Sequence, residues 1–219
     1  MYTKTRILST KKLSFTQREL LLNASFSLIE FDAITIQPLP FESKKEIGNA
    51  IIASKNAVRQ VLEANIDMNQ CFCVGEKTSR LLVENHKKVV KTTENALELA
   101  HFIAKNYKND EFTFFCGNKR RDELPDFLKE NNIALDEIPV YKTELNPKKI
   151  EGEFDGIFFF SPSAIQSYIQ ENTIGNSIAF CIGNTTAKEA KKYTKNIIIT
   201  NKPTIENTIV QAVKHFKND

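Results

Sequence analysis

Histidine and cysteine are scarce in this sequence. It has three histidines and four cysteines in 219 residues, and none of the histidines lies near a cysteine. Zinc sites need these residues at matched spacings such as C-x-x-C, and the sequence has no such pair. It also has no recognisable Ser-His-Asp, Cys-His or paired-carboxylate arrangement. The sequence therefore predicts no metal site and no conventional hydrolase chemistry.

Long apolar runs and an excess of one charge are missing as well. No stretch approaches the roughly 18 apolar residues of a membrane span, and the N-terminus has no apolar signal region. The 30 basic residues are nearly balanced by 27 acidic ones, which leaves a formal charge of +3. We therefore expect a cytoplasmic protein with no membrane or nucleic-acid partner. Cys71, Cys73, Cys116 and Cys181 are expected as small buried hydrophobic residues.

What the sequence does contain is a long internal repeat. Ile51–Leu62 (IIASKNAVRQVL) resembles Phe158–Ile169 (FFFSPSAIQSYI), and Cys73–Thr78 (CVGEKT) resembles Cys181–Thr186 (CIGNTT). The offsets, 161 − 54 = 107 and 181 − 73 = 108, are far longer than one unit of a solenoid. The repeat therefore predicts two similar domains of about 100 residues each. A cleft between two such domains is a common place for a small ligand to bind.

Apolar runs of strand length alternate with segments of helical periodicity along the whole chain. This alternation predicts an α/β protein in which helices flank a parallel sheet in each domain. Two β-α-β units are expected, each read as a strand, a helix and an extended segment: 6–10, 16–25 and 28–37 in the first, and 112–116, 122–131 and 133–141 in the second. The first unit opens the chain, whereas the second closes its middle segment, so the two copies are not in simple tandem.

This order predicts that one domain is inserted into the other. Residues 1–37 and 144–219 are expected to combine into a discontinuous α/β domain, and residues 40–139 to form the inserted α/β domain. Connectors at about 34–40 and 139–143 then cross between the domains. We expect these connectors to pair as a two-stranded ribbon.

Both repeated motifs place a short polar turn between a strand and a helix. Ser161 is a good N-cap with Pro162 at the first helical position, and Ser54 has the matching place in the first copy. Helix starts at the carboxyl ends of parallel strands offer unpaired N–H groups to anions. Such residues are also favoured as caps where no ligand binds, so each is either a cap or part of an anion site. Neither turn has the glycine pattern of a nucleotide-phosphate loop.

Two basic turns and one tyrosine complete the set of candidate groups. Cys116–Arg121 (CGNKRR) is the densest basic turn, and Ser9–Lys12 (STKK) is its counterpart in the other half. Charge runs are usually solvated surface, but two of them at equivalent strand ends suit a ligand with several carboxylates or phosphates. Tyr141, in the returning connector, either donates a proton near the cleft or packs against the hinge.

Several motifs occur together in a specific order. They are IIASKNAV and CVGEKT in the middle segment, VYKT at Val140–Thr143, FFFSPSAI at Phe158–Ile165, CIGNTTAKEA at Cys181–Ala190 and KPTIENTIVQAV at Lys202–Val213. With these motifs, the sequence resembles the uroporphyrinogen-III synthase family over essentially its whole length.

The resemblance implies a cofactor-free lyase of haem biosynthesis that acts on the linear tetrapyrrole hydroxymethylbilane. This substrate loses its terminal hydroxyl as water to give an azafulvene cation, and ring D is inverted through a spiro intermediate before the macrocycle closes as uroporphyrinogen III. Much of the reactivity belongs to the pyrroles, so the protein mainly has to fold the substrate. We expect a monomer that needs no cofactor.

The resemblance also implies a set of site residues. Tyr141 matches the family's connector tyrosine and is expected to help the hydroxyl leave as water. The substrate carboxylates are expected to bind residues of the helix starts and of the basic turn: Ser54, Lys55, Asn56, Gly75, Thr78, Lys119, Arg121, Ser161, Ser163, Ala164, Gly183, Asn184, Thr185 and Thr186. The alternative is a non-catalytic two-domain binding module that closes on an anionic small molecule.

Overall fold

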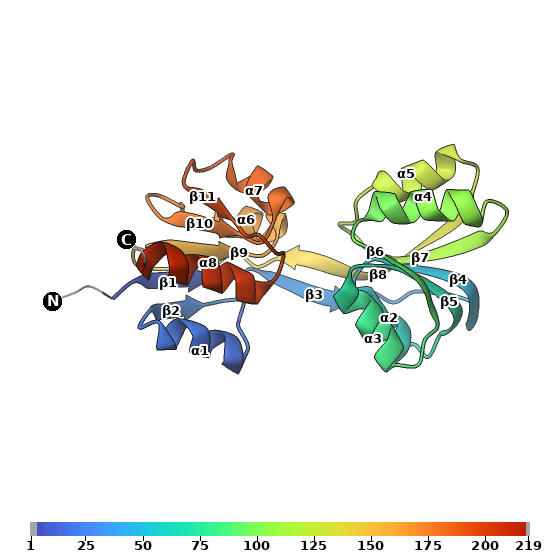
Figure 1. Ribbon diagram of the computed structural model, residues 1–219, viewed down its shortest axis with the longest axis horizontal. Helices are drawn as coiled ribbons and strands as arrows, with labels where there is room; N and C mark the ends of the chain where they lie inside the picture. Colours follow the sequence, from blue (N-terminus) through green and yellow to red (C-terminus); the bar gives the residue numbers. More distant parts are fainter. Residues whose placement is uncertain (1–3, 218–219) are drawn as a thin grey trace. The chain divides into compact units, whose positions relative to one another are not determined.

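Each half of the repeat folds into its own β-sheet, with helices on both faces (Figure 1). The computed structural model describes residues 4–217 and divides the chain into two units. Unit 1 combines the chain up to Thr35 with the chain from Glu144 onward, and unit 2 is Ile36–Thr143. The predicted fold class, parallel sheets flanked by helices, is confirmed.

Unit 1 has a five-stranded parallel sheet in the order β11-β10-β9-β1-β2. Its strands are β1 (Arg6–Ser9), β2 (Ser27–Glu30), β9 (Gly156–Phe159), β10 (Ile178–Cys181) and β11 (Ile197–Ile199), and its helices are α1 (Phe15–Asn23), α6 (Pro162–Tyr168), α7 (Asn184–Ala190) and α8 (Ile205–Lys217). Helices α1 and α8 pack on one face of the sheet with Phe158, and α6 and α7 pack on the other face with Phe159. Because both faces are covered, β9, β10 and β11 are continuous apolar runs.

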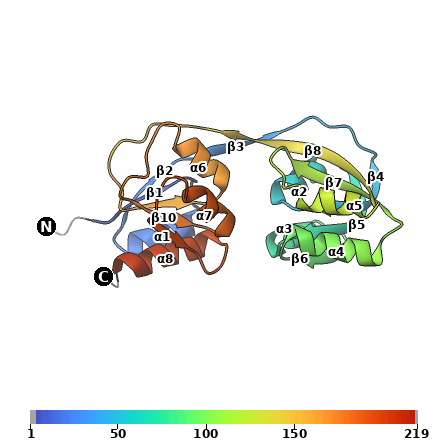
Figure 2. The same cartoon turned by 90° about the horizontal axis from the view of Figure 1, so that it is seen from above.

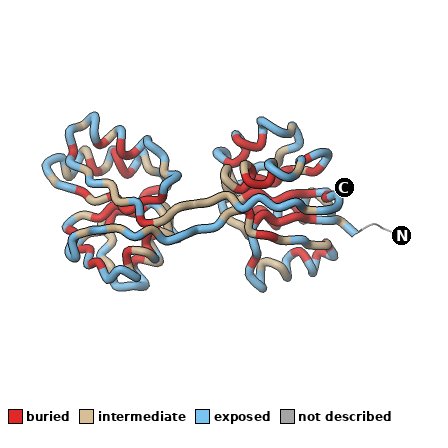
Figure 3. The backbone as a smooth tube through the Cα atoms, turned by 180° about the vertical axis from the view of Figure 1, so that it is seen from behind, coloured by how far each residue is buried: buried red, intermediate tan, exposed pale blue. Residues whose placement is uncertain are grey.

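Unit 2 has a six-stranded sheet in the order β3-β8-β7-β4-β5-β6, parallel from β8 to β6. Its strands are β3 (Ile34–Pro38), β4 (Glu46–Ile52), β5 (Asp67–Val74), β6 (Val89–Thr93), β7 (Glu111–Gly117) and β8 (Ala134–Leu145), and its helices are α2 (Lys55–Glu63), α3 (Glu76–Glu84), α4 (Ala96–Asn106) and α5 (Glu123–Glu130). Helices α2 and α3 cover one face, where Val58 and Leu82 are buried, and α4 and α5 cover the other, where Leu99 and Leu128 are buried. The buried residues, red in Figure 3, concentrate in the strands and on the helix faces turned toward them.

The two connecting segments pair with each other, as expected. β3 lies beside β8 at the edge of the six-stranded sheet, and the chain passes from one unit to the other within these two strands. The Leu39 N–H donates to the Val140 carbonyl at 3.0 Å within unit 2. Among residues 4–217, no helix is both long and apolar enough to cross a membrane.

The prediction of one extended segment over 28–37 is wrong. This stretch contains β2 and β3, which belong to different sheets. Between the two strands, Phe31 and Ala33 are buried in the core beneath α6 and α7, and the Asp32 carboxylate accepts a hydrogen bond from the Lys12 N–H at 2.9 Å. These three contacts end β2 and turn the chain before β3 begins.

Two helices differ in detail from their predicted form. In α1 only Leu21 is buried, whereas Leu20 and Leu22 are exposed, so the leucine run does not mark a wide buried face. Helix α5 begins at Glu123, one residue later than expected. The carboxylate of Asp122 makes no capping bond to this helix, because it is paired with the guanidinium of Arg120.

Candidate functional site

A cleft of about 380 Å³ lies in unit 2, at the carboxyl ends of its parallel strands. Such strand ends are where open α/β sheets bind their ligands. The lining residues come from the last residues of β5 and β7, from β8, and from the segments and helix starts that follow β4, β6 and β7. They include Ser54, Asn95, Gly117, Lys119, Arg121 and Tyr141. Four of the residues predicted from the sequence, Ser54, Lys119, Arg121 and Tyr141, are therefore brought together.

Tyr141 and Ser54 form the central hydrogen bond of this cleft. The Ser54 hydroxyl donates to the Tyr141 phenol oxygen at 3.0 Å, and it accepts a hydrogen bond from the Ala57 N–H at 3.2 Å. Ser54 thus caps α2 and holds the phenol at the same time. Because the phenol oxygen accepts this bond, its own hydrogen is available to a further acceptor in the cleft.

A register shift in the sheet places Tyr141 on this side. Cys116 pairs with Pro139, but Gly117 pairs with Tyr141, so Val140 is an extra residue on β8. Val140 and Tyr141, although adjacent, both pack with the core under α2 and α3. Regular alternation would send Tyr141 to the opposite face, so the bulge directs the phenol toward Ser54.

The surroundings of Tyr141 favour the acid form that a phenol already has at neutral pH. Burial raises the pKa of Tyr141 above its ordinary value, and the hydrogen bond from Ser54 opposes this rise only in part. The phenol is therefore protonated throughout the neutral range. A protonated hydroxyl at a ligand cleft can act as a general acid.

The basic turn after β7 is anchored through Arg120, which the sequence analysis did not single out. The Arg120 guanidinium pairs with Asp122 and with Glu137 on β8, to which it donates at 3.0 Å. Partial burial opposes the charge of Arg120, but the bonds to the two carboxylates raise its pKa overall. Two carboxylates thus offset this charge, while the side chains of Lys119 and Arg121 are exposed at the cleft.

The remaining predicted residues of unit 2 lie at two helix starts. Lys55 is exposed and Asn56 is half-buried in the first turn of α2, next to Ser54. Gly75 is the N-cap of α3 and has φ +84°, which favours glycine. Thr78, in the first turn of α3, is buried, so its hydroxyl is not at the surface.

The predicted residues of unit 1 lie at the carboxyl ends of two neighbouring strands of its sheet. β9 and β10 are paired, with Cys181 opposite Phe159, and the helices that follow, α6 and α7, lie side by side (Figures 1 and 2). The Ser161 hydroxyl accepts from the Ala164 N–H at 3.1 Å and so caps α6. Ser161 and Ser163 are half-buried, Ala164 is buried, Gly183 is half-buried, Asn184 and Thr185 are exposed, and Thr186 is buried.

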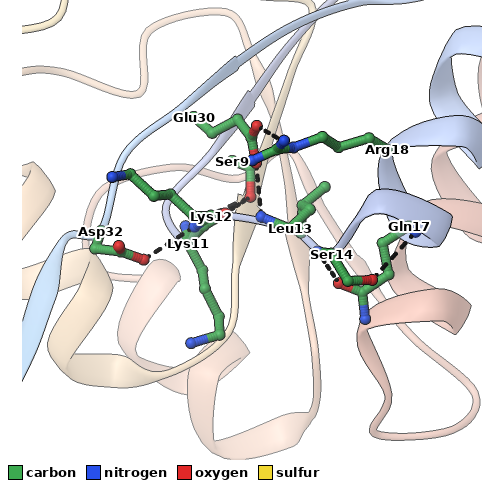
Figure 4. A network of polar contacts seen from close by, with 9 residues as sticks. All are labelled: Ser9, Lys11, Lys12, Leu13, Ser14, Gln17, Arg18, Glu30 and Asp32. Atoms are coloured by element: carbon green, nitrogen blue, oxygen red, sulfur yellow. Dashed lines mark hydrogen bonds and ion pairs between the residues drawn. The ribbon is translucent and has the colours of Figure 1, made fainter.

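The second basic turn, after β1, is anchored in a different way (Figure 4). The Glu30 carboxylate at the end of β2 accepts from the Leu13 N–H at 2.6 Å and pairs with Arg18 of α1 at 2.6 Å. The Lys12 N–H donates to Asp32. The backbone of this turn is therefore tied to the strand that follows, and the side chains of Lys11 and Lys12 are exposed.

The four cysteines are buried, as expected, and none forms a disulfide. Burial raises the pKa of the thiols to about 12 for Cys71, about 11 for Cys116 and about 12 for Cys181. Among residues 4–217, no group of three or more histidine, cysteine, aspartate or glutamate side chains is arranged to hold a metal ion.

Comparison with known proteins gives the family of the chain. A family model described as "Uroporphyrinogen-III synthase HemD" matches residues 17–209. The chain belongs to the uroporphyrinogen-III synthase family. The "Porphyrin biosynthesis protein HemD" of Ruminiclostridium josui is 28% identical over 238 aligned positions, which cover 94% of this chain and 47% of that protein. An uncharacterized Rickettsia prowazekii protein is 32% identical over 134 positions, which cover 61% of this chain and 46% of that protein.

The chain thus spans about half the length of these curated relatives.

Solved structures of the synthase family share its fold. The Helicobacter pylori uroporphyrinogen-III synthetase has a TM-score of 0.74 at 19% identity, covering 96% of this chain and 99% of that one. A mutant Thermus thermophilus uroporphyrinogen-III synthase has a TM-score of 0.69 at 12% identity, covering 98% and 100%.

Asn95, Gly117 and Arg120 are among the cleft residues that were not predicted as part of the site. Each had a signal in the sequence. Gly117 and Arg120 lie inside the basic turn CGNKRR. Asn95 is a typical capping residue and is the N-cap of α4. Residue types alone did not reveal that Arg120 is paired with two carboxylates, because Glu137 is 17 positions away in the sequence.

Proposed function

We propose that this chain is a uroporphyrinogen-III synthase that converts hydroxymethylbilane into uroporphyrinogen III, with inversion of ring D and loss of water. Membership of the family supports the choice of reaction. The observation that carries the proposal is the Tyr141 phenol, which lies in a strand-end cleft and accepts a hydrogen bond from the Ser54 hydroxyl, with burial raising its pKa further above the neutral range.

In this proposal, Tyr141 acts first as a general acid. It donates the phenol proton to the terminal hydroxyl of the substrate as the carbon–oxygen bond breaks, so water leaves and an azafulvene cation forms. The substituted carbon of ring D attacks this cation to give the spiro intermediate, whose fragmentation and recombination invert the ring. The ring-D carbon that closes the macrocycle then loses its hydrogen as a proton. This proton replaces the one that the phenol gave up, so water is the only by-product.

Ser54 is proposed to orient the phenol during this step. Its donated hydrogen bond stabilises negative charge on the phenol oxygen as the proton departs. A positioned acid of this kind typically contributes about 10²–10⁴-fold to the rate. The rest of the rate enhancement comes from folding the substrate so that ring D meets the cation.

The substrate carboxylates are proposed to bind at the helix starts and the basic turn. Lys119 and Arg121 offer exposed charges beside Tyr141, and Arg120 holds the turn that carries them. Lys55 and Asn56 in unit 2, and Ser161, Ser163 and Thr185 in unit 1, lie at helix starts, where the positive end of the helix dipole favours an anion. Thr78 and Thr186 are buried, so their side chains are not proposed to contact a carboxylate directly.

We further propose that the enzyme is a cofactor-independent lyase, acts as a monomer and works in the cytoplasm without nucleic acid. The pyrroles themselves supply the reactivity, which supports a reaction without a cofactor. Four unpaired cysteines are typical of a reducing compartment. The small formal charge of +3 gives no general attraction to nucleic acid.

A coupled turnover assay tests this function. Hydroxymethylbilane is generated enzymatically from porphobilinogen, the protein is added, the products are oxidised, and the type I and type III porphyrins are separated by chromatography. We expect type III in the presence of the protein and type I in its absence. Type I alone in both reactions would reject the synthase function and leave the non-catalytic binding module.

A further inference from the structure

Gly117 lies directly against the phenol of Tyr141. A β-carbon built on Gly117 would be 2.4 Å from Cζ and 2.8 Å from the hydroxyl oxygen of Tyr141. Carbon atoms normally pack at about 3.5–4.0 Å, so a side chain at this position and the present phenol exclude each other. The backbone of Gly117 does not have a positive φ, so the backbone conformation itself does not demand glycine.

The strand that carries Tyr141 is held on both sides. The Asn118 N–H donates to the Tyr141 carbonyl at 3.1 Å, and the Asn118 side chain accepts from the Thr143 N–H at 2.8 Å. On the other side, the Leu39 N–H donates to the Val140 carbonyl. Because these bonds fix the backbone of β8, a clash at Gly117 is relieved most easily by movement of the tyrosine ring.

We propose that Gly117 is a positioning residue, whose missing side chain seats the Tyr141 phenol against Ser54. The bulge at Val140 turns Tyr141 to the face of the sheet on which Gly117 would place its side chain, beside Phe115 of the same core. The glycine leaves this place empty, and the phenol fills it. The catalytic consequence of this role rests on the proposed function, whereas the structural consequence does not.

The first test compares two glycines of the same sheet. In Gly117→Ala the phenol end of Tyr141 has to move by about 1 Å, which changes the geometry of its bond with Ser54. A misplacement of this size can cost about 10²-fold in rate, so we expect kcat for type III formation to fall by about that factor with little change in KM. Gly48→Ala is the matched control, because a β-carbon on Gly48 of β4 meets nothing within 4 Å. Equal kcat values for Gly117→Ala and wild type would overturn the proposal.

The second test asks whether Gly117 acts through the phenol. In the Tyr141→Phe background the hydroxyl is already gone, so adding Gly117→Ala should lower kcat by less than threefold. A loss as large as that in the wild-type background would show that Gly117 acts on something other than the phenol. That result would also overturn the proposal.

A spectroscopic test is independent of enzyme activity. The chain has five tyrosines, and in protein labelled with ¹³C at tyrosine Cζ the Tyr141 resonance is the one that Tyr141→Phe removes. We expect this resonance, and its pH titration, to shift in Gly117→Ala and to stay unchanged in Gly48→Ala. An unshifted Tyr141 resonance in Gly117→Ala would contradict the proposed positioning even if the protein had no synthase activity, so failure of the two proposals can be told apart.

Discussion

The two copies of the repeated helix start have the same cap but different neighbours. Ser54 and Ser161 each accept a hydrogen bond from the N–H three residues later, as serines at N-caps do. Ser54 also donates to the Tyr141 side chain, whereas within residues 4–217 the structure describes no hydrogen bond from Ser161 to another side chain. The comparison shows that one repeated residue caps a helix in both units and, in unit 2 alone, also contacts the proposed acid.

The repeated glycines differ in a similar way. Gly75 has φ +84°, a conformation that favours glycine, while Gly183 has φ 178°, which any residue adopts. Sequence identity at matched positions therefore reflects a conformational need in unit 2 but not in unit 1. The same chemistry cannot be assumed at both ends of the repeat, and the predictions below test where the units diverge.

The largest expected effect is on the chemical step in unit 2. Tyr141→Phe removes the proposed acid, so kcat for type III formation should fall by about 10²–10⁴-fold while substrate still binds. Tyr193→Phe in unit 1 is the control, because Tyr193 is exposed and should leave kcat unchanged. Stopped-flow or quenched assays of the purified variants measure both. Unchanged turnover in Tyr141→Phe would remove this tyrosine from the mechanism.

The two capping serines should give different kinetic signatures. Ser54→Ala and Ser161→Ala should each lower the free energy of unfolding by about 1 kcal/mol through the lost cap. Ser54→Ala should also lower kcat by about tenfold, since one hydrogen bond contributes about 1–1.5 kcal/mol. Ser161→Ala should instead raise KM, because its proposed role is in binding. If both variants changed only KM, Ser54 would have no special link to Tyr141.

Alkaline pH should destabilise unit 2 before unit 1. Cys71, Cys73 and Cys116 of unit 2 and Cys181 of unit 1 all have raised pKa values. Above pH 9 the unfolded chain loses thiol protons that the folded chain retains, so stability is full below the ordinary thiol pKa and declines as pH rises toward 12. Hydrogen exchange at pH 7 and pH 10, with protection compared between the units, measures this. Equal loss of protection in both units would contradict the expected order.

The smallest expected difference concerns the two basic turns. Arg120→Gln loosens the turn that carries Lys119 and Arg121, so KM should rise a few-fold with a stability change of less than about 1 kcal/mol. Arg18→Gln should have a weaker effect on KM, because Glu30 still accepts the Leu13 N–H and keeps its turn in place. Steady-state kinetics of the two variants measure both KM values. A larger rise for Arg18→Gln would show that the turn of unit 1 depends more on its arginine.

Sequence patterns were sufficient for the layout of the fold. The parallel sheets, the pairing of the connectors and the caps at Ser54 and Ser161 were all predicted, because apolar runs and capping residues are local signals. The break between β2 and β3 was missed, because it depends on burial of Phe31 and Ala33 in a core built from distant segments.

The fine structure of the cleft could not be predicted for the same reason. The candidate residues Ser54 and Tyr141 were identified, but not the bond between them, since they are 87 positions apart. The bulge at Val140 appears only when β7 and β8 are paired in register. Nothing in the local sequence shows that Gly117 makes room for a phenol, because the clash it avoids arises only in the folded sheet.

The pH dependence of kcat for type III formation tests most directly whether the partly buried phenol of Tyr141 is the acid of the proposed reaction. Because burial raises the pKa of Tyr141, its acid form is present throughout the neutral range and is lost only when pH rises above the ordinary tyrosine value of about 10. We therefore predict a rate that stays level from pH 7 to pH 9 and falls at higher pH. The residual activity of Tyr141→Phe should not show this alkaline fall. A rate that falls between pH 6 and pH 8, or an alkaline limb that survives in Tyr141→Phe, would contradict the account.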